Sequence, residues 1–221
     1  MPRPDDNIIH VRFARTQPIT ADALACLDVS ERAEASRLPQ EAAQDYVRAH
    51  LLLRQTLSEF ADIAPADWRF DRAAHGKPFT LQAPLHFNLS HARGMVAIAV
   101  SLSREVGIDV EKIEPHRADA IIARQMFSPS EFELWQGAQD RVATFFHIWT
   151  MKEAVMKASG LGMALPLHSF NVTLASPQFV HTRVDELWRG EFGILDQSFA
   201  WALAASCPSQ NDPLIIHKSQ E

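Results

Sequence analysis

The sequence predicts an α+β protein made of two lobes. The order strand, helices, strands occurs twice along the 221 residues, and the second round starts near Arg104. Runs rich in Ala, Leu, Glu and Arg mark the helices, and short apolar runs between turn residues mark the strands. No low-complexity segment or linker separates the two rounds. We therefore expect an N-terminal lobe at residues 1–104 that packs directly against a C-terminal lobe at 105–221.

The first round opens on a loosely alternating strand and closes on short strands between turn residues. Between them the composition is helical, and Pro39 breaks it into two helices, because proline cannot continue a helix. The leucines that follow residue 50 fit the core face of the second helix. We expect strands at residues 8–13, 85–89 and 95–102, and the two helices within 21–60.

The second round carries clearer helix boundaries. Ser128 fits an N-cap, Pro129 the first helical position and Glu131 the partner in a capping box. Gly160 fits the end of the last and longest helix. We expect strands at residues 106–110, 169–174, 179–184 and 199–206, and helices at 118–126, from 128 onward, and at 142–159.

Composition excludes several classes of protein. Hydrophobic residues are 47% and charged residues 22% of the chain, which is typical of a soluble globular protein. The net charge of −6 argues against a protein that wraps nucleic acid. No apolar run approaches the roughly 18 residues that cross a bilayer, and the start lacks the pattern of a signal peptide. Two distant cysteines make a disulfide framework unlikely, so we expect a cytoplasmic protein.

The segment at residues 106–111 places two carboxylates on one face of a strand. Side chains two apart on a strand point the same way, so Asp109 and Glu111 project together while Ile108 and Val110 face a core. Paired carboxylates repel each other unless a cation or a proton lies between them, and a hard divalent ion prefers oxygen ligands. Taken alone, such a pattern more often marks a half-exposed sheet face than a metal site.

A second group of charged residues lies on the longest predicted helix. Glu153 and Lys157 are four residues apart and share one helical face. In one interpretation they are an ordinary surface ion pair. In the other, Glu153 is a third acid near the metal ion, and Lys152 or Lys157 neutralises phosphate oxygens.

Candidate phosphate contacts lie in the first lobe. Lys77 stands on a rigid turn between Gly76 and Pro78, and Ser90 and His91 end a strand. Residues of these types are also common in loops that have no binding role. The turn is not a P-loop, because it lacks the preceding glycine-rich run and the following Ser or Thr.

In combination and in order, these segments resemble the Sfp-type 4′-phosphopantetheinyl transferases. The resemblance spans residues 76–162 and is supported by Phe127, Ser128 and Glu131. The matching pieces are Gly76-Lys77-Pro78, Phe87-Asn88-Leu89-Ser90-His91, Gly107-Ile108-Asp109-Val110-Glu111, Trp149-Thr150-Met151-Lys152-Glu153-Ala154, Lys157 and Gly160-Leu161-Gly162.

The resemblance implies a fold and a reaction. Two similar lobes, each a small antiparallel sheet packed with helices, would be related by a pseudo-twofold, with coenzyme A (CoA) in the cleft between them. The 4′-phosphopantetheine arm of CoA would pass to a serine of an apo acyl- or peptidyl-carrier protein, releasing 3′,5′-ADP. The carrier would belong to fatty acid, polyketide or non-ribosomal peptide synthesis.

The resemblance also implies roles for single residues. Asp109, Glu111 and Glu153 would hold Mg²⁺ in the C-terminal lobe. We expect Glu153 to take the proton of the serine and Lys157 to stabilise the leaving 3′,5′-ADP. The CoA contacts would be Lys77, Ser90, His91, Lys152, Lys157 and Arg48. Arg37, Arg48 and Arg54 are the candidates for gripping the 3′-phosphate.

Two other functions compete with this hypothesis. One is an inactive module that binds CoA or a carrier protein, although a mere binder does not need all three acids. The other is a different Mg²⁺-dependent nucleotide enzyme, which the missing phosphate-loop signature disfavours. We expect a monomer, because one chain forms the cleft, and a carrier-docking surface at Leu161, Met163, Leu165 and Leu167. Core packing accounts equally well for those four residues.

Overall fold

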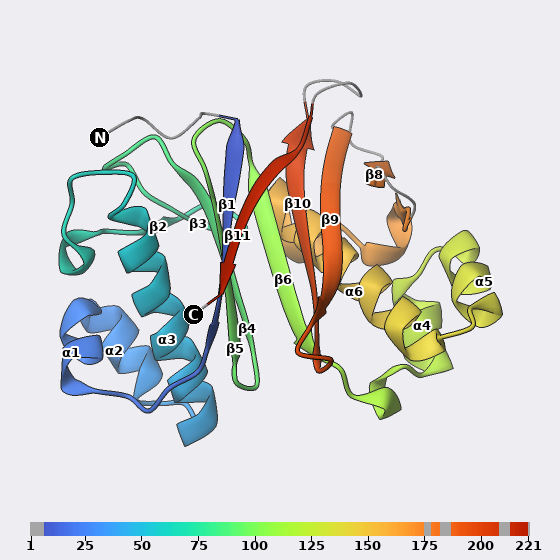
Figure 1. Cartoon of the computed structure of the whole chain (residues 1–221), viewed down its shortest axis with the longest axis horizontal. Helices are drawn as coiled ribbons and strands as arrows, with labels where there is room; N and C mark the ends of the chain where they lie inside the picture. The colour runs from blue at the N-terminus through green and yellow to red at the C-terminus, as the bar shows by residue number, and fades with distance from the viewer. Residues whose placement is uncertain (1–6, 175–177, 182–186, 208–212, 221) are drawn as a thin grey trace.

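A computed structural model describes residues 7–174, 178–181, 187–207 and 213–220 of the chain. Two sheets stand side by side at the centre of the molecule, and helices flank them on both outer sides (Figure 1). The order of strands is β11-β1-β5-β4 in the first sheet and β6-β10-β9-β8-β7 in the second. A short β2–β3 hairpin forms a third pairing. Among the described residues, no helix is long and apolar enough to span a membrane.

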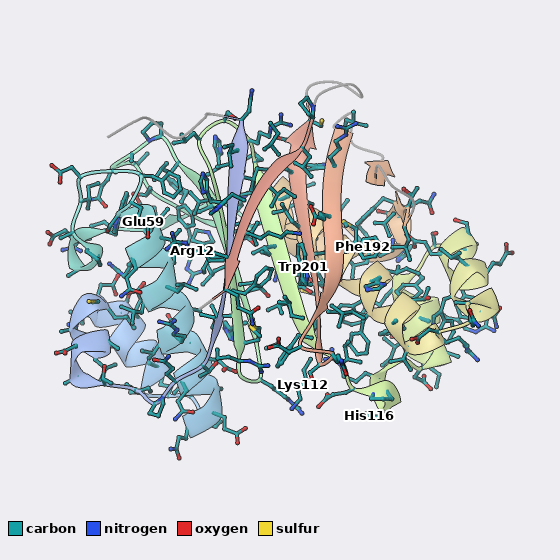
Figure 2. The ribbon with its side chains drawn as sticks, viewed as in Figure 1. Arg12, Glu59, Lys112, His116, Phe192 and Trp201 are labelled. Atoms are coloured by element: carbon teal, nitrogen blue, oxygen red, sulfur yellow. The ribbon has the colours of Figure 1, made fainter. Side chains whose placement is uncertain are left out.

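The first lobe packs its helices against one sheet. The long helix α3 (Gln40–Leu57) covers β4 (His86–Ala92) and β5 (Met95–Ser101), and its leucines enter a core with Trp68 and Phe87. Arg12, which extends from β1 towards α3, pairs with Glu59 (Figure 2). The other elements of this lobe are β1 (Ile8–Arg15), α1 (Ala21–Cys26), α2 (Val29–Ala35), β2 (Asp71–Arg72) and β3 (Pro78–Phe79).

The second lobe repeats this arrangement. Its long helix α6 (Arg141–Ser159) packs on β6 (Val106–Lys112) and β10 (Phe199–Cys207). The other elements are α4 (Ala120–Met126), α5 (Pro129–Gly137), β7 (Asn171–Val172), β8 (Gln178–His181) and β9 (Leu187–Leu195). In each lobe, the first strand pairs antiparallel with the last strand of a closing hairpin, and two short helices precede a long one.

A buried ion pair recurs in both lobes. The capping-box acid of the second short helix, Glu31 or Glu131, binds a cation from the long helix. In the first lobe the cation is Arg54, at 2.7 Å from Glu31, and it also donates to the carbonyls of Pro65 and Trp68. Separating either pair would leave a buried charge without a partner, which would strongly destabilise the fold. This pair fixes the short helix against the long one.

The two sheets meet at their edge strands. The β6 amides of Ile108 and Val110 donate to side chains of β4, Asn88 Oδ1 at 2.9 Å and Ser90 Oγ at 3.3 Å. The edges are thus joined by side-chain hydrogen bonds and not by a backbone ladder. A shared core of aliphatic and aromatic residues, including Phe13 of β1 and Trp201 of β10, fills the space between the sheets.

The structure corrects the predicted fold at several elements. The first predicted helix is two helices, because Asp28 caps α2 and breaks the run. β9 and β11 (Ile215–Gln220) were not predicted, and β11 pairs parallel with β1, so the first sheet is not purely antiparallel. Of the strand predicted at 179–184, residues 182–184 lie outside the described residues.

β9 escaped prediction because it contains two glycines, which usually weaken a strand. Close packing requires Gly190 and leaves little room at Gly193. A Cβ on Gly190 would lie 2.6 Å from the Met151 sulfur, and one on Gly193 would lie 3.0 Å from the Trp201 indole nitrogen.

Candidate active site

A close helix–strand contact builds the floor of the site. A Cβ on Gly107 of β6 would lie 2.1 Å from the Ala154 carbonyl and 2.3 Å from the Ala158 nitrogen. Only glycine therefore lets α6 approach β6 so closely. The contact brings the β6 carboxylates to the helix face that carries Glu153 and Lys157. Beyond this point β6 leads through Lys112 and His116 towards α4 (Figure 2).

Asp109, Ser90 and Lys157 form a compact polar cluster on the seam between the lobes. Lys157 Nζ donates to Asp109 Oδ1 at 2.7 Å, to Ser90 Oγ at 2.9 Å and to the Ile108 carbonyl at 3.2 Å. Ser90 Oγ also donates to Asp109 Oδ1 at 3.0 Å. Asp109 is 4% exposed, and its other oxygen, Oδ2, is buried with no hydrogen-bond partner. A buried carboxylate oxygen of this kind has unused capacity for a cation.

Glu153 faces the same cluster from α6. Burial, followed by the negative charges of Asp109 and Glu111, raises the pKa of Glu153 to about 7, and Lys157 opposes the shift. Glu111 is drawn to Arg117, whose Nη1 lies 2.8 Å from its Oε2. Among the described residues, no three acids, histidines or cysteines converge closely enough to hold a metal ion. The three carboxylates therefore share one region without forming a finished ligand set.

Lys77 lines a cavity of about 210 Å³ between the lobes. Its ammonium binds Glu105 Oε2 at 2.6 Å, the Ala158 carbonyl at 2.9 Å and the Val106 carbonyl at 3.3 Å. The cavity is lined by His75, Gly76, Lys77, Pro78, Asn88 and Leu89 of the first lobe, and by Met156, Lys157, Gly160 and Gly162 of the second.

The remaining predicted contacts are spread over the first lobe. His91, next to Ser90 on β4, keeps an exposed edge. Burial of the rest of the ring lowers the pKa of His91, Asp45 opposes the shift, and the charges of Lys157 and His50 add to it. Arg48 is half-buried on α3. Arg37 is exposed beside a cavity of about 640 Å³ that Tyr46 and His50 also line. Arg54 is fully buried in the ion pair with Glu31 and cannot reach a phosphate.

Lys152 does not belong with these contacts. Its side chain is fully buried within the second lobe, 2.8 Å from Glu131, and donates to the carbonyls of Leu167 and Phe170 at 2.6 Å. Burial lowers the pKa of Lys152, and Glu131 opposes that shift. The predicted CoA contact is corrected here: Lys152 is the second lobe's counterpart of Arg54.

Replacing Lys152 by methionine is expected to destabilise the protein by about 3 kcal/mol or more, because Glu131 would keep a buried, uncompensated charge. Urea unfolding measures the loss. In the matched control, Lys218→Met, the exposed pair with Glu191 is lost, and the expected change is under about 1 kcal/mol. Equal stability of Lys152→Met and the parent would contradict a buried ionic role.

Sequence reasoning missed three residues of the site. Asn88 anchors β6, Arg117 holds Glu111, and Glu105 binds Lys77. Asn88 stood inside a recognised motif, but nothing in the sequence pointed to its backbone partner. Arg117 and Glu105 lie in polar stretches, where their partners become visible only in three dimensions.

Comparison with known proteins assigns both lobes to one group. Residues 14–103 match the family model described as 4′-phosphopantetheinyl transferase, N-terminal. Residues 105–204 match the model described as 4′-phosphopantetheinyl transferase superfamily. The two matches together cover nearly all of the described chain.

Curated relatives carry the same description. A 4′-phosphopantetheinyl transferase of Bacillus subtilis is 34% identical over 155 residues, which are 68% of each chain. HetI of Nostoc is 33% identical over 65% of this chain and 63% of its own length. Sfp of Bacillus subtilis strain 168 is 35% identical over 61% of this chain and 60% of its own.

Solved structures match less of the chain. A holo-(acyl-carrier-protein) synthase from Bacillus anthracis, in complex with CoA (3′,5′-ADP), is 16% identical, with a TM-score of 0.40. It covers 46% of this chain and 94% of its own. A likeness of this size adds nothing to the sequence matches.

Proposed function

The chain belongs to the 4′-phosphopantetheinyl transferase superfamily, and we propose that its interlobe cleft holds CoA and Mg²⁺ for transfer of the phosphopantetheine arm to a carrier-protein serine. Transfer from CoA to a carrier protein is the activity of the family. The cation, the roles of the residues and the path of the proton are our proposals.

The donor set of the cleft fits Mg²⁺. Asp109 offers a buried oxygen without a partner, and the pKa of Glu153 is raised by burial and then by the charges of Asp109 and Glu111. Both observations describe excess negative charge that a hard divalent cation relieves. We assign Asp109, Glu111 and Glu153 as its ligands. When bound, Mg²⁺ would offset charge on the pyrophosphate of CoA and act as a template.

Glu153 is proposed as the base that accepts the proton of the carrier serine. Its carboxylate faces the Asp109 cluster one helical turn before Lys157, on the side of α6 where the serine would enter, and a positioned carboxylate can take a proton in the transition state. Lys157 is proposed to stabilise the leaving 3′,5′-ADP, because a fixed cation acts where negative charge develops. Ser90 and Asp109 hold the Lys157 ammonium in place for this role.

CoA would lie across the seam, with its phosphates near Ser90 and Lys157 and its nucleotide towards the first lobe. His91 and Arg48 are proposed as first-lobe contacts. The matching order of strands and helices in the two lobes supports a pseudo-twofold relation, with the cleft at the axis. One chain supplies both walls of the cleft, so we propose a monomer.

The carrier protein is proposed to dock near the end of α6. Met163 is 95% exposed there, which suits an apolar contact. Leu165 and Leu167 are buried and belong to the core of the second lobe, so they are removed from the predicted docking surface.

The observation that carries this proposal is the buried, partnerless oxygen of Asp109 beside Lys157 and Glu153. To test the proposal, the protein is mixed with CoA, Mg²⁺ and an apo-carrier protein, and chromatography measures the release of 3′,5′-ADP. An inactive module would bind CoA or the carrier and release no nucleotide. Release that does not require the carrier would point to a different nucleotide enzyme.

Mg²⁺ binding is expected to strengthen with pH. The raised pKa of Glu153 keeps its carboxyl largely protonated below about pH 7, and a ligand must lose that proton. Apparent Mg²⁺ affinity should therefore rise by roughly tenfold between pH 6 and pH 8, as the ionised fraction grows. Calorimetry measures it, with Glu153→Gln as the control that should lose this dependence. A flat profile in the parent would count against Glu153 as a ligand.

A further inference from the structure

The ammonium of Lys77 is bound by acceptors of the opposite lobe. An ammonium has three donors. The three acceptors are Glu105 Oε2, the Ala158 carbonyl and the Val106 carbonyl, at 2.6, 2.9 and 3.3 Å. All three belong to the second lobe, whereas Lys77 stands at the end of a first-lobe turn. The side chain of Lys77 is only 14% exposed.

Glu105 is built firmly into the second lobe. Its backbone N–H donates to Ser206 Oγ at 3.0 Å, and the Ser206 N–H donates back to the Glu105 carbonyl at 2.9 Å. Its carboxylate then reaches two first-lobe groups, the Lys77 ammonium and, at 2.9 Å, His86 Nδ1. Hydrogen bonds from His86 and from Lys77 lower the pKa of Glu105 to about 2. The carboxylate is therefore ionised throughout the useful pH range.

These contacts define the spacing of the cleft. The cavity of about 210 Å³ has one wall from each lobe, and Lys77, which lines it, bonds across from the first lobe to the second. The Ala158 carbonyl lies in the last turn of α6, where unpaired carbonyls favour a cation. The Lys77 stem also approaches Gly160, at whose position a Cβ would lie 3.5 Å from Lys77 Cδ. An exposed Lys–Glu pair alone would contribute little, but here two carbonyls and a buried stem join it.

We propose that Lys77 and Glu105 form an interlobe clasp that sets the width of the CoA cleft, and that Lys77 serves CoA by holding these walls and not as a ligand of its phosphates. The proposal rests on the proposed function only in placing CoA in this cleft. It makes Glu105 a positioning residue, and it changes the role assigned to Lys77.

Glu105→Ala gives opposite results for the two roles of Lys77. If Lys77 is a phosphate ligand, removal of Glu105 frees the ammonium and deletes a negative charge near an anion site, so CoA affinity rises. If Lys77 and Glu105 are a clasp, the walls lose their spacing and CoA affinity falls by roughly tenfold or more, the scale of a lost charge-assisted bond. Calorimetry with CoA measures whether the affinity rises or falls.

Matched variants complete the test. Lys77→Met should weaken CoA binding about as much as Glu105→Ala, and the double variant should be hardly worse than either, because both break one device. Glu191→Ala, which removes an acid from an exposed ion pair with Lys218, should leave CoA affinity unchanged. Should Glu105→Ala fail to fold, Glu105→Gln keeps the side-chain size, and the clasp again predicts that CoA affinity falls.

Hydrogen exchange separates this proposal from the proposed function. Without CoA, amides of residues 71–79 should exchange faster in Glu105→Ala than in the parent, and Glu191→Ala should not change them. That result would hold even if the parent showed no transfer activity. Higher or unchanged CoA affinity in Glu105→Ala, or unchanged exchange at residues 71–79, would overturn the clasp.

Discussion

Replacing Asp109 by asparagine is expected to reduce transfer by roughly 10³-fold or more. Stabilisation of phosphate charge by a bound metal amounts to several kcal/mol, and each 1.36 kcal/mol is tenfold in rate. Asparagine keeps the size of Asp109 and can still accept from Ser90 and Lys157, so the seam between the lobes should persist. Asparagine is preferable to alanine here, because Asp109 is buried in a hydrogen-bonded cluster and is not an open strand-edge residue.

The kinetics of Asp109→Asn are measured with saturating CoA and carrier over a range of Mg²⁺ concentrations. Urea unfolding of the same preparation shows whether the loss is chemical or structural. Glu191→Ala, in the exposed pair with Lys218 and two strands away from β6, serves as the control and should transfer at the parental rate. A folded Asp109→Asn with parental turnover would remove Asp109 from the metal site.

Replacing Glu153 by glutamine is expected to slow transfer roughly 10²–10⁴-fold, with CoA affinity changed only a few-fold. Glutamine keeps one acceptor oxygen but cannot accept a proton at neutral pH. The reason to single out Glu153 is its position one helical turn before Lys157, close enough to Asp109 for that charge to raise its pKa. Single-turnover kinetics measure the chemical step directly.

Titration with Mg²⁺ separates the two roles of Glu153. If Glu153 only ligates the metal, high Mg²⁺ should restore most of the lost rate, because mass action refills a weakened site. If Glu153 is the base, no concentration of Mg²⁺ restores it. Recovery to near the parental rate would therefore defeat the base assignment and leave the ligand role alone.

Local signals in the sequence predicted much of the fold. The capping box of Ser128 and Glu131 is confirmed at the start of α5, and Gly160 ends α6 in the left-handed conformation. The alternation around Asp109 is confirmed too, since Ile108 and Val110 lie in the core between the sheets. Such features depend on neighbours along the chain, which is why they could be read without a structure.

Features that depend on distant neighbours could not be read in this way. Lys152 lies beside Glu153 in the sequence, yet its side chain leaves α6 in a different direction and is buried against Glu131. A lysine in a motif of charged residues gives no sign of which helical face is buried when apolar residues surround the helix. Glu105 looked like an ordinary polar residue between two strands. Its significance comes from Lys77, 28 positions earlier in the chain.

The central claim is that this cleft moves the phosphopantetheine arm from CoA to a carrier protein with the Asp109 cluster. Intact-mass measurement of a panel of apo-carrier proteins, incubated with CoA and Mg²⁺, tests it most directly. At least one carrier should gain the mass of one phosphopantetheine arm with the parent and with Glu191→Ala, and none with Asp109→Asn or with EDTA. An equal gain in EDTA or with folded Asp109→Asn, or no gain on any carrier with the parent, would contradict the account.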